Sequence, residues 1–250
     1  MSKGARSAAA RERIAAQRQA DRKRDRRRRL ATIAGVAVVA VAAVGFGSWY
    51  AASQDTAEAP RQGLAPTTVN SDGSVTMAQA GVESPVLDVF EDFQCPACKS
   101  MEDSSGSTIR NLAAEGKAKV VYHPITIFPQ EPTRSNSIRA GAAARCVTDG
   151  AQWVAFHDKL FQEQPPETVE GFRLNDLVSW GKSAGVTAPD FADCVTTQRK
   201  AKAQEQFSTT TMRQQKLTGT PTVKLNGKEL GNETIFVPAK LRQAVQAAAQ

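Results

Sequence analysis

The sequence is poor in the side chains from which most metal sites are built. It holds two histidines and four cysteines, and only Cys95 and Cys98 are closely spaced. A structural zinc site needs four ligands, usually in two closely spaced pairs. The other two cysteines lie far apart, and His123 and His157 fit no ligand pattern, so both histidines are expected to be structural. The sequence therefore disfavours zinc at the close cysteine pair and predicts neither a metal nor another cofactor.

The body of the chain also lacks the positive charge that the composition suggests. The net charge of the whole chain is +7. Residues 1–29 hold twelve Lys or Arg and three acids, a net of +9, so the other 221 residues carry 7 − 9 = −2. The basic character belongs to an N-terminal tail, and it does not indicate a nucleic-acid-binding domain in the rest of the chain.

Residues 30–52 contain no charged side chain. A helix of this length spans about 34 Å, enough to cross a bilayer core of about 30 Å. The preceding arginine cluster marks the cytoplasmic side, and Trp49 and Tyr50 occupy the place of an aromatic belt at the far end. A cleaved signal peptide is the alternative, but its apolar region is usually about 7–15 residues long. We predict a cytoplasmic tail (1–29), a single transmembrane anchor (30–52), a linker (53–67) and an extracytoplasmic domain (68–250).

The apolar spacing after the linker predicts one α/β domain without internal repeats. Alternating and buried patterns predict strands near 84–93 and 117–125, and three- and four-residue spacing predicts a block of helices from about 133 to 217. Asp72-Gly73 and Asn226-Gly227 are typical of hairpin turns. Helices are expected to begin at Pro96, with a break near 104–106, and at Pro238.

The close cysteines form the stretch CPAC at the expected start of a helix. Side chains three positions apart on a helix have Cβ atoms about 5–6 Å apart, which allows a disulfide after small adjustment. Cys95 is expected at the helix cap, facing solvent, where the helix dipole and free N–H groups favour its thiolate. Cys98 is expected to be shielded. This asymmetry suits thiol–disulfide exchange; an inert disulfide is the alternative, although so short a loop contributes little stability.

The remaining cysteines, Cys146 and Cys194, are expected to form a structural disulfide. Disulfides persist outside the cytoplasm. Both residues fall in predicted helices among small or apolar neighbours, and once Cys95 and Cys98 are paired, only this pairing remains. A second redox pair that relays electrons is the alternative.

A buried strand leading into EDFQCPACK, a helical insertion, and GTPTVKLNG about 120 residues later resemble the DsbA-like branch of the thioredoxin superfamily, in its membrane-anchored bacterial form. The resemblance covers residues 68–250. It implies a thioredoxin-like fold with a helical insertion at about 133–217. It also implies a cis peptide at Thr220-Pro221 beside Cys95, with the Thr220 backbone docking an extended substrate. An ordinary trans proline opening a strand is the alternative.

The chain departs from the family pattern in front of the cysteines. Many thioredoxin-like proteins carry a buried acid six residues before the first cysteine, where this chain has Val89. Asp88, Glu91 and Asp92 are candidates for that role, but all three are expected to be solvated carboxylates at the end of a strand.

The resemblance implies a thiol:disulfide oxidoreductase that transfers a disulfide to exported proteins with free cysteines. Cys95 would be the nucleophile and Cys98 the resolving cysteine, and the family suggests a quinone-linked integral membrane oxidase as the recycling partner. The dipeptide Pro96-Ala97 lacks the histidine of the most oxidising relatives. A reductase or isomerase, or a metal-binding module of the same fold, therefore remains an alternative.

Overall fold

The computed structural model describes residues 63–249. The expected cytoplasmic tail, the expected anchor at 30–52 and most of the linker lie outside these residues. Within the described range, no helix combines the length and the apolar character that a membrane span requires.

The described domain is built on a six-stranded mixed sheet in the order β1-β2-β4-β3-β5-β6. The central pair, β3 and β4, is parallel, and every other neighbouring pair is antiparallel. The strands are β1 (Thr67–Val69), β2 (Val75–Met77), β3 (Val86–Glu91), β4 (Lys119–Pro124), β5 (Thr222–Leu225) and β6 (Lys228–Glu229). Both strands expected from the buried apolar runs, at 84–93 and 117–125, are therefore confirmed.

Both expected hairpins are also present. Asp72-Gly73 connects β1 and β2, and Gly73 adopts a φ of 94°. Asn226 and Gly227 connect β5 and β6 with φ values of 50° and 79°. Two successive positive φ values are the signature of a type I′ turn, whose twist matches that of the flanking strands.

Helices fill the connections between the strands. The segment between β3 and β4 holds α2 (Pro96–Met101), a π-helical turn η1 (Glu102–Gly106) and α3 (Ser107–Ala114). The expected break of the first helix is thus a π turn. Five helices separate β4 from β5 and form the expected insertion: α4 (Thr133–Ala144), α5 (Gly150–Gln162), α6 (Leu174–Ser183), α7 (Phe191–Thr196) and α8 (Ala201–Gln215). The chain closes with α9 (Asn232–Ile235) and α10 (Pro238–Ala248), the latter starting at the expected proline.

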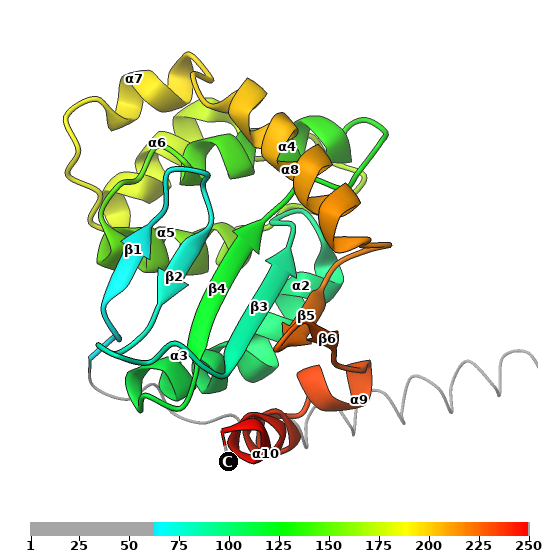
Figure 1. The fold of residues 1–250 in the computed structure, drawn as a ribbon. Coiled ribbons are helices and arrows are strands. Elements are labelled where there is room, and N and C mark those ends of the chain that lie inside the picture. Colours follow the sequence, from blue (N-terminus) through cyan, green and yellow to red (C-terminus); the bar gives the residue numbers. More distant parts are fainter. Residues whose placement is uncertain (1–62, 250) are drawn as a thin grey trace, which may run out of the picture. The chain divides into compact units, whose positions relative to one another are not determined.

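The arrangement of these layers places the first cysteine pair beside the insertion. The arrowheads of β3 and β4 point toward the end of the sheet where the inserted helices gather, whereas α3 and α10 lie toward the opposite end (Figure 1). Because α2 follows β3 directly, its N-terminus lies at the carboxyl end of the central strands, where α/β sheets commonly hold their sites.

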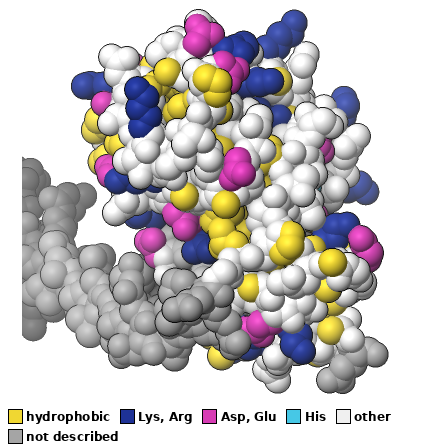
Figure 2. Space-filling model, turned by 90° about the vertical axis from the view of Figure 1, so that its left-hand side faces the viewer, with side chains coloured by type: hydrophobic (Ala, Val, Ile, Leu, Met, Phe, Trp, Pro, Cys, Tyr) yellow, Lys and Arg dark blue, Asp and Glu magenta, His cyan; other side chains and the backbone are white. Residues whose placement is uncertain are grey.

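The core includes one face of the central strands. Leu87 and Val89 of β3 and Val120 of β4 are fully buried, and Leu241 and Val245, one helical turn apart on α10, are buried as well. In the described part of the chain, only Leu64 and Val169 are large hydrophobic side chains with high exposure, at 44% and 48%. The surface drawn in Figure 2 accordingly shows hydrophobic side chains in scattered groups among charged ones.

Candidate active site

Cys95 and Cys98 occupy the first turn of α2. Cys95 is the N-cap residue with an extended backbone (φ −79°, ψ 117°), and Pro96 takes the first helical position, where its missing N–H costs nothing. Both cysteines are free thiols, so the structure corresponds to the reduced form of the pair. The expectation that Cys95 faces solvent is wrong: it is 6% exposed and Cys98 is fully buried. The loop before β5 accounts for part of this burial, as described below.

The pKa values of the two thiols are shifted in opposite directions. A hydrogen bond from the Cys98 thiol is the largest cause that lowers the pKa of Cys95, and backbone N–H groups of α2 add to it against the opposing effect of burial; the pKa falls from 9.0 to about 6. Burial raises the pKa of Cys98 well above its usual value, and the neighbouring Cys95 raises it further. The helix start therefore supports one thiolate and one protonated thiol, which is the asymmetry expected from the sequence.

The segment before β5 lies against Cys95. The Thr220–Pro221 peptide is cis. The Cys95 sulfur is 3.4 Å from the Thr220 carbonyl oxygen, to which the protonated form of the thiol donates. Two positions 125 residues apart in the chain are thus in contact, in the geometry that the family resemblance implies.

Three acids precede the cysteines in the sequence, and all three were expected to be solvated. Asp88 is partly solvated, whereas Glu91 and Asp92 are not. The Asp88 side chain is 25% exposed and pairs with His123 at 2.9 Å. Glu91 is fully buried and Asp92 is 1% exposed. They are buried because the inserted helices cover the carboxyl end of β3, which sequence patterning could not show.

Asp92 is held by a full set of donors beside the buried cysteine. Its carboxylate accepts hydrogen bonds from the Ser137 hydroxyl at 2.5 Å, from the Ile127 N–H at 2.9 Å and from the Gln94 N–H at 2.9 Å. Its own backbone N–H lies 3.5 Å from the Cys98 sulfur. Burial raises the pKa of Asp92 to about 7 despite these hydrogen bonds.

The insertion contributes polar groups that the sequence analysis missed. The Gln164 side-chain amide donates to the carbonyl oxygens of Phe93 and Cys95 at 2.7 and 3.0 Å. The Lys99 ammonium donates to the Phe161 carbonyl at 2.7 Å. These contacts tie the start of α2 to the end of α5. No local signal marks such residues, because they act on backbone groups far away in sequence.

A buried polar cluster lies behind α2. His157 of α5 is 2% exposed, and its Nε2 is 2.7 Å from Glu91 Oε1. Burial opposes the charged form of His157, but Glu91 and Asp158 raise its pKa to about 10. Burial raises the pKa of Glu102 to about 7. His157 was expected to be structural, and nothing in its sequence context indicated these carboxylate neighbours.

The insertion carries the second cysteine pair. Cys146, just after α4, is joined to Cys194 of α7 by a disulfide with a Cα–Cα distance of 5.9 Å. This is the pairing expected from the sequence. The bond connects two helices of the insertion and leaves Cys95 and Cys98 as the free pair among the described residues.

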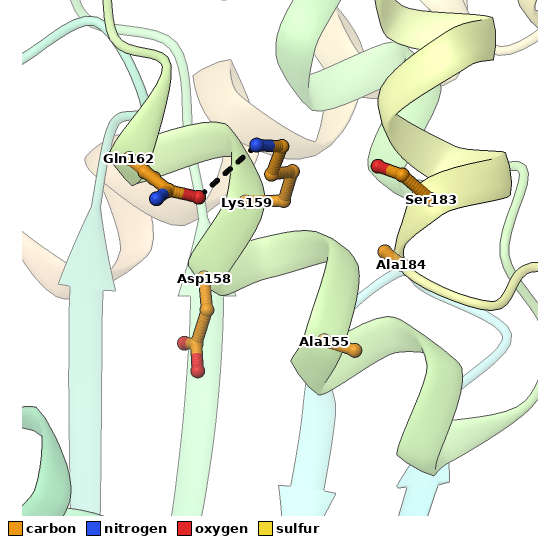
Figure 3. Close-up of a pocket in the computed structure, with 6 residues that line it drawn as sticks. All are labelled: Ala155, Asp158, Lys159, Gln162, Ser183 and Ala184. Atoms are coloured by element: carbon orange, nitrogen blue, oxygen red, sulfur yellow. Dashed lines mark hydrogen bonds between the residues drawn. The ribbon is translucent and has the colours of Figure 1, made fainter.

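An open groove of about 480 Å³ runs between α5 and α6, and it does not include the cysteines of α2. In Figure 3, the Lys159 ammonium turns toward Gln162 on the same helix, whereas Asp158 points away from α6. Asp158 also lines a smaller pocket of about 160 Å³ that reaches α2, η1 and α3. The larger groove is therefore separate from the thiol site, and Asp158 faces the smaller one.

Comparison with known proteins agrees with this geometry. The sequence model described as thioredoxin matches residues 76–246. Comparison with curated proteins gives no match. Among solved structures, oxidised Mycobacterium tuberculosis DsbA is similar with a TM-score of 0.59 and 27% identity, covering 73% of this chain and 91% of that one.

Two further solved structures show the same fold. Reduced DsbG, a disulfide bond oxidoreductase of Mycobacterium tuberculosis, has a TM-score of 0.60 and 27% identity, with 78% of this chain and 91% of that chain covered. MdbA, a thiol-disulfide oxidoreductase of Actinomyces oris, has a TM-score of 0.61 at 22% identity, with 78% and 98% covered. With a thioredoxin fold, a helical insertion and a CxxC at the start of α2, this chain belongs to the thioredoxin family and has DsbA-type proteins as its structural neighbours.

Proposed function

We propose that this chain is an extracytoplasmic thiol:disulfide oxidoreductase that donates the Cys95–Cys98 disulfide to exported proteins. The observation that carries the proposal is the opposite shift of the two thiol pKa values, with Cys95 lowered to about 6 and Cys98 raised. At neutral pH the Cys95 thiolate predominates. Stabilising this thiolate favours the reduced pair, which makes the disulfide a stronger oxidant.

The proposed reaction begins when a client thiolate attacks the Cys95 sulfur of the disulfide. The Cys95–Cys98 bond breaks, Cys98 leaves and takes up a proton, and a mixed disulfide joins the client to Cys95. A second client thiolate then attacks the client sulfur and releases Cys95 as a thiolate. The client gains a disulfide, and its two electrons remain on the CxxC pair.

The segment before β5 is the proposed docking element for the client. The Thr220 carbonyl lies 3.4 Å from the Cys95 sulfur. Backbone groups at that distance from the reacting sulfur can pair with an extended client segment, which supplies affinity without demanding a particular sequence. Thr220 and Pro221 would therefore align the client cysteine with Cys95.

A complete cycle needs a partner that removes the two electrons. We infer that a quinone-linked integral membrane thiol oxidase fills this role, since the family resemblance suggests such a protein and the expected anchor at 30–52 would hold both proteins in one membrane. The anchor and the extracytoplasmic location belong to the proposal.

The reduction potential decides between donation and reduction of disulfides. We expect equilibration of the full chain with glutathione to give a potential above about −180 mV, toward the range of strong oxidants. A value near about −270 mV, typical of thioredoxin, would instead support a reductase. Each 30 mV corresponds to about 1.4 kcal/mol for this two-electron couple.

The roles of the two cysteines are tested by trapping. A Cys98→Ser variant should accumulate mixed disulfides with client proteins, because no thiol remains to resolve them. The matched Cys95→Ser variant should trap few. Equal trapping by the two variants, or the reverse order, would contradict the assignment of Cys95 as nucleophile.

A further inference from the structure

Three potential metal ligands from separate segments meet behind α2. They are Glu91 at the end of β3, Glu102 at the start of η1 and His157 in α5. One ligand atom from each lies within 4.8 Å of the others. Exposure is 0% for Glu91, 9% for Glu102 and 2% for His157. The cluster is therefore a built interior site and not a group of surface acids.

The hydrogen bonds of this cluster are incomplete on the side where its members face one another. Glu91 Oε1 contacts His157 Nε2 at 2.7 Å. Glu91 Oε2 and Glu102 Oε1 are buried and have no hydrogen-bond partner, and the same is true of the Tyr122 hydroxyl. The Tyr122 ring packs on His157 with a centroid distance of 5.2 Å. Buried carboxylate oxygens are rarely left without a donor or a cation, so these two oxygens are open to a further partner, which a bound cation could supply.

Hydrogen bonds hold the outer side of the cluster in place. His157 Nδ1 lies 3.0 Å from Asp158 Oδ1, and the Arg110 guanidinium donates to Glu102 Oε2 at 3.1 Å and to Asp158 Oδ1 at 3.2 Å. A histidine that contacts a carboxylate through one ring nitrogen and offers the other inward is the usual arrangement in metal sites. The candidate ligands are thus oriented by partners that would not themselves bind the ion.

The π turn provides room for the second carboxylate. A Cβ atom at Gly106 would collide with Glu102 Oε2. Glycine at this position therefore leaves space for the Glu102 carboxylate inside the turn. Single π turns occur often at functional sites, and here the turn brings a glutamate toward Glu91 and His157.

The site has a route to solvent. Glu102 lines the smaller pocket of about 160 Å³ together with Asp158, whereas Glu91 and His157 do not. Glu102 is accordingly the most exposed of the three ligands. An ion could enter past Glu102, and water in this pocket could complete its coordination.

We propose that Glu91, Glu102 and His157 form a binding site for a divalent transition-metal ion, with Zn²⁺ as the best match. Zinc accepts imidazole nitrogen and carboxylate oxygen as ligands, and open zinc sites commonly have three protein ligands with water in the fourth position. Two carboxylates balance the charge of the ion. On binding, the proton between Glu91 and His157 leaves, and both groups become ligands of the same ion. The site uses neither cysteine of α2.

Zinc titration of the purified full chain tests the proposal. The Cys95–Cys98 pair is kept oxidised so that its sulfurs do not compete for the metal. Calorimetry and metal content after dialysis should give one Zn²⁺ per chain. Glu102→Gln, which keeps the side-chain shape, and His157→Gln should each abolish stoichiometric binding. Asp158→Asn, which alters only the outer partner, should weaken binding roughly 10- to 100-fold.

His123→Gln is the matched control. His123 also pairs with a carboxylate, Asp88, at 2.9 Å, but it is not part of the three-ligand cluster. This variant should bind zinc like the unmodified chain. The proposal is overturned if the unmodified chain binds zinc no more tightly than Glu102→Gln does, or if His123→Gln loses binding to the same extent. The Glu102→Gln result decides the matter even if His157→Gln does not fold.

Discussion

At the scale of single residues, the first turn of α2 separates two chemically identical side chains. Cys95 receives a thiol hydrogen bond and helix N–H groups, whereas Cys98 is buried without comparable stabilisation of its anion. A thiolate is stabilised by hydrogen-bond donors, and of the two cysteine positions only the cap position supplies enough of them. Position along one helical turn thus decides which sulfur is charged at neutral pH.

The first prediction concerns the pH dependence of Cys95. Alkylation of the reduced protein by iodoacetamide should reach half of its maximal rate near pH 6, because the thiolate is the reactive form and the Cys95 pKa is about 6. Cys98→Ala removes the largest cause of the lowered pKa, so the midpoint should move toward 9. A midpoint above about 8 in the unmodified protein would contradict the assigned ionisation.

The same ionisation affects the stability of the reduced fold. The folded pKa of Cys95 lies below its ordinary value of 9.0. Its contribution to stability is therefore complete above about pH 9 and is lost as the pH falls through about 6.

The second prediction concerns Asp92. Replacing Asp92 by Ala removes the acceptor of three hydrogen bonds and leaves the Ser137, Ile127 and Gln94 donors without it in the interior. We expect a loss of about 3–5 kcal/mol in the free energy of unfolding, measured with urea on the reduced protein. Asp88→Ala, which removes a partly exposed partner of His123, should cost about 1 kcal/mol or less. Similar losses for both variants would contradict the buried role of Asp92.

At the scale of elements, the turn between β5 and β6, which Asn226-Gly227 predicts, can be tested separately from side-chain packing. Gly227 has a φ of 79°, and a Cβ atom there would meet nothing within 4 Å. Gly227→Ala should therefore cost about 1–2 kcal/mol of unfolding free energy through backbone conformation alone. Gly219→Ala is the control, because Gly219 has equally open surroundings and no positive φ. Equal effects in urea unfolding would show that the turn geometry is not the cause.

Elements with local signals were predictable. Contacts between distant segments were not, apart from the Cys95–Thr220 contact that the family resemblance implied and the Cys146–Cys194 pairing. Pro96, Pro238 and Asn226-Gly227 mark their helix starts and turn because the preference resides in the residue itself. The burial of Glu91 and the hydrogen bond from the Gln164 amide to the Phe93 carbonyl depend on where the insertion folds back onto the end of β3. No periodicity within either segment carries that information. The cysteine pairs were predictable because their chemistry restricts the possible partners.

At the scale of the whole molecule, the insertion is held together by a covalent link that the thiol site does not use. Cys146 and Cys194 are 48 positions apart, and closing a loop of that size contributes about 4 kcal/mol in chain-entropy terms. That is a large share of a typical domain stability of about 5–15 kcal/mol.

Reduction should therefore proceed in two stages. Mild dithiothreitol treatment of the oxidised protein should release Cys95 and Cys98 first. Cys146 and Cys194 should resist until the domain unfolds, because their bond closes a loop of 48 positions and stabilises the fold, whereas the short loop between Cys95 and Cys98 contributes little. Thiol counting during the titration, with circular dichroism as a measure of folding, checks this order. Release of all four thiols from a folded domain would indicate a second redox pair.

The last prediction concerns the expected anchor at 30–52. We expect it to remain in the mature protein, with the basic tail in the cytoplasm and the domain outside, because the reverse orientation would carry twelve cationic side chains across the membrane. N-terminal sequencing of the mature protein checks retention, and a reporter fused to the C-terminus checks orientation. A mature chain beginning after Ala52 would refute the anchor, and a cytoplasmic reporter would refute the orientation.

The position of β3 between β4 and β5 has a consequence for the chain during its synthesis. Ribosomes make the CxxC early, yet the Thr220 carbonyl that contacts Cys95 is made 125 residues later, together with the strand that completes the edge of β3. A growing chain therefore carries its reactive cysteines without their docking partner while the next 125 residues are made. The cysteine pair becomes a finished site only when residues beyond Pro221 have been made, so incomplete chains carry the thiols without the complete site.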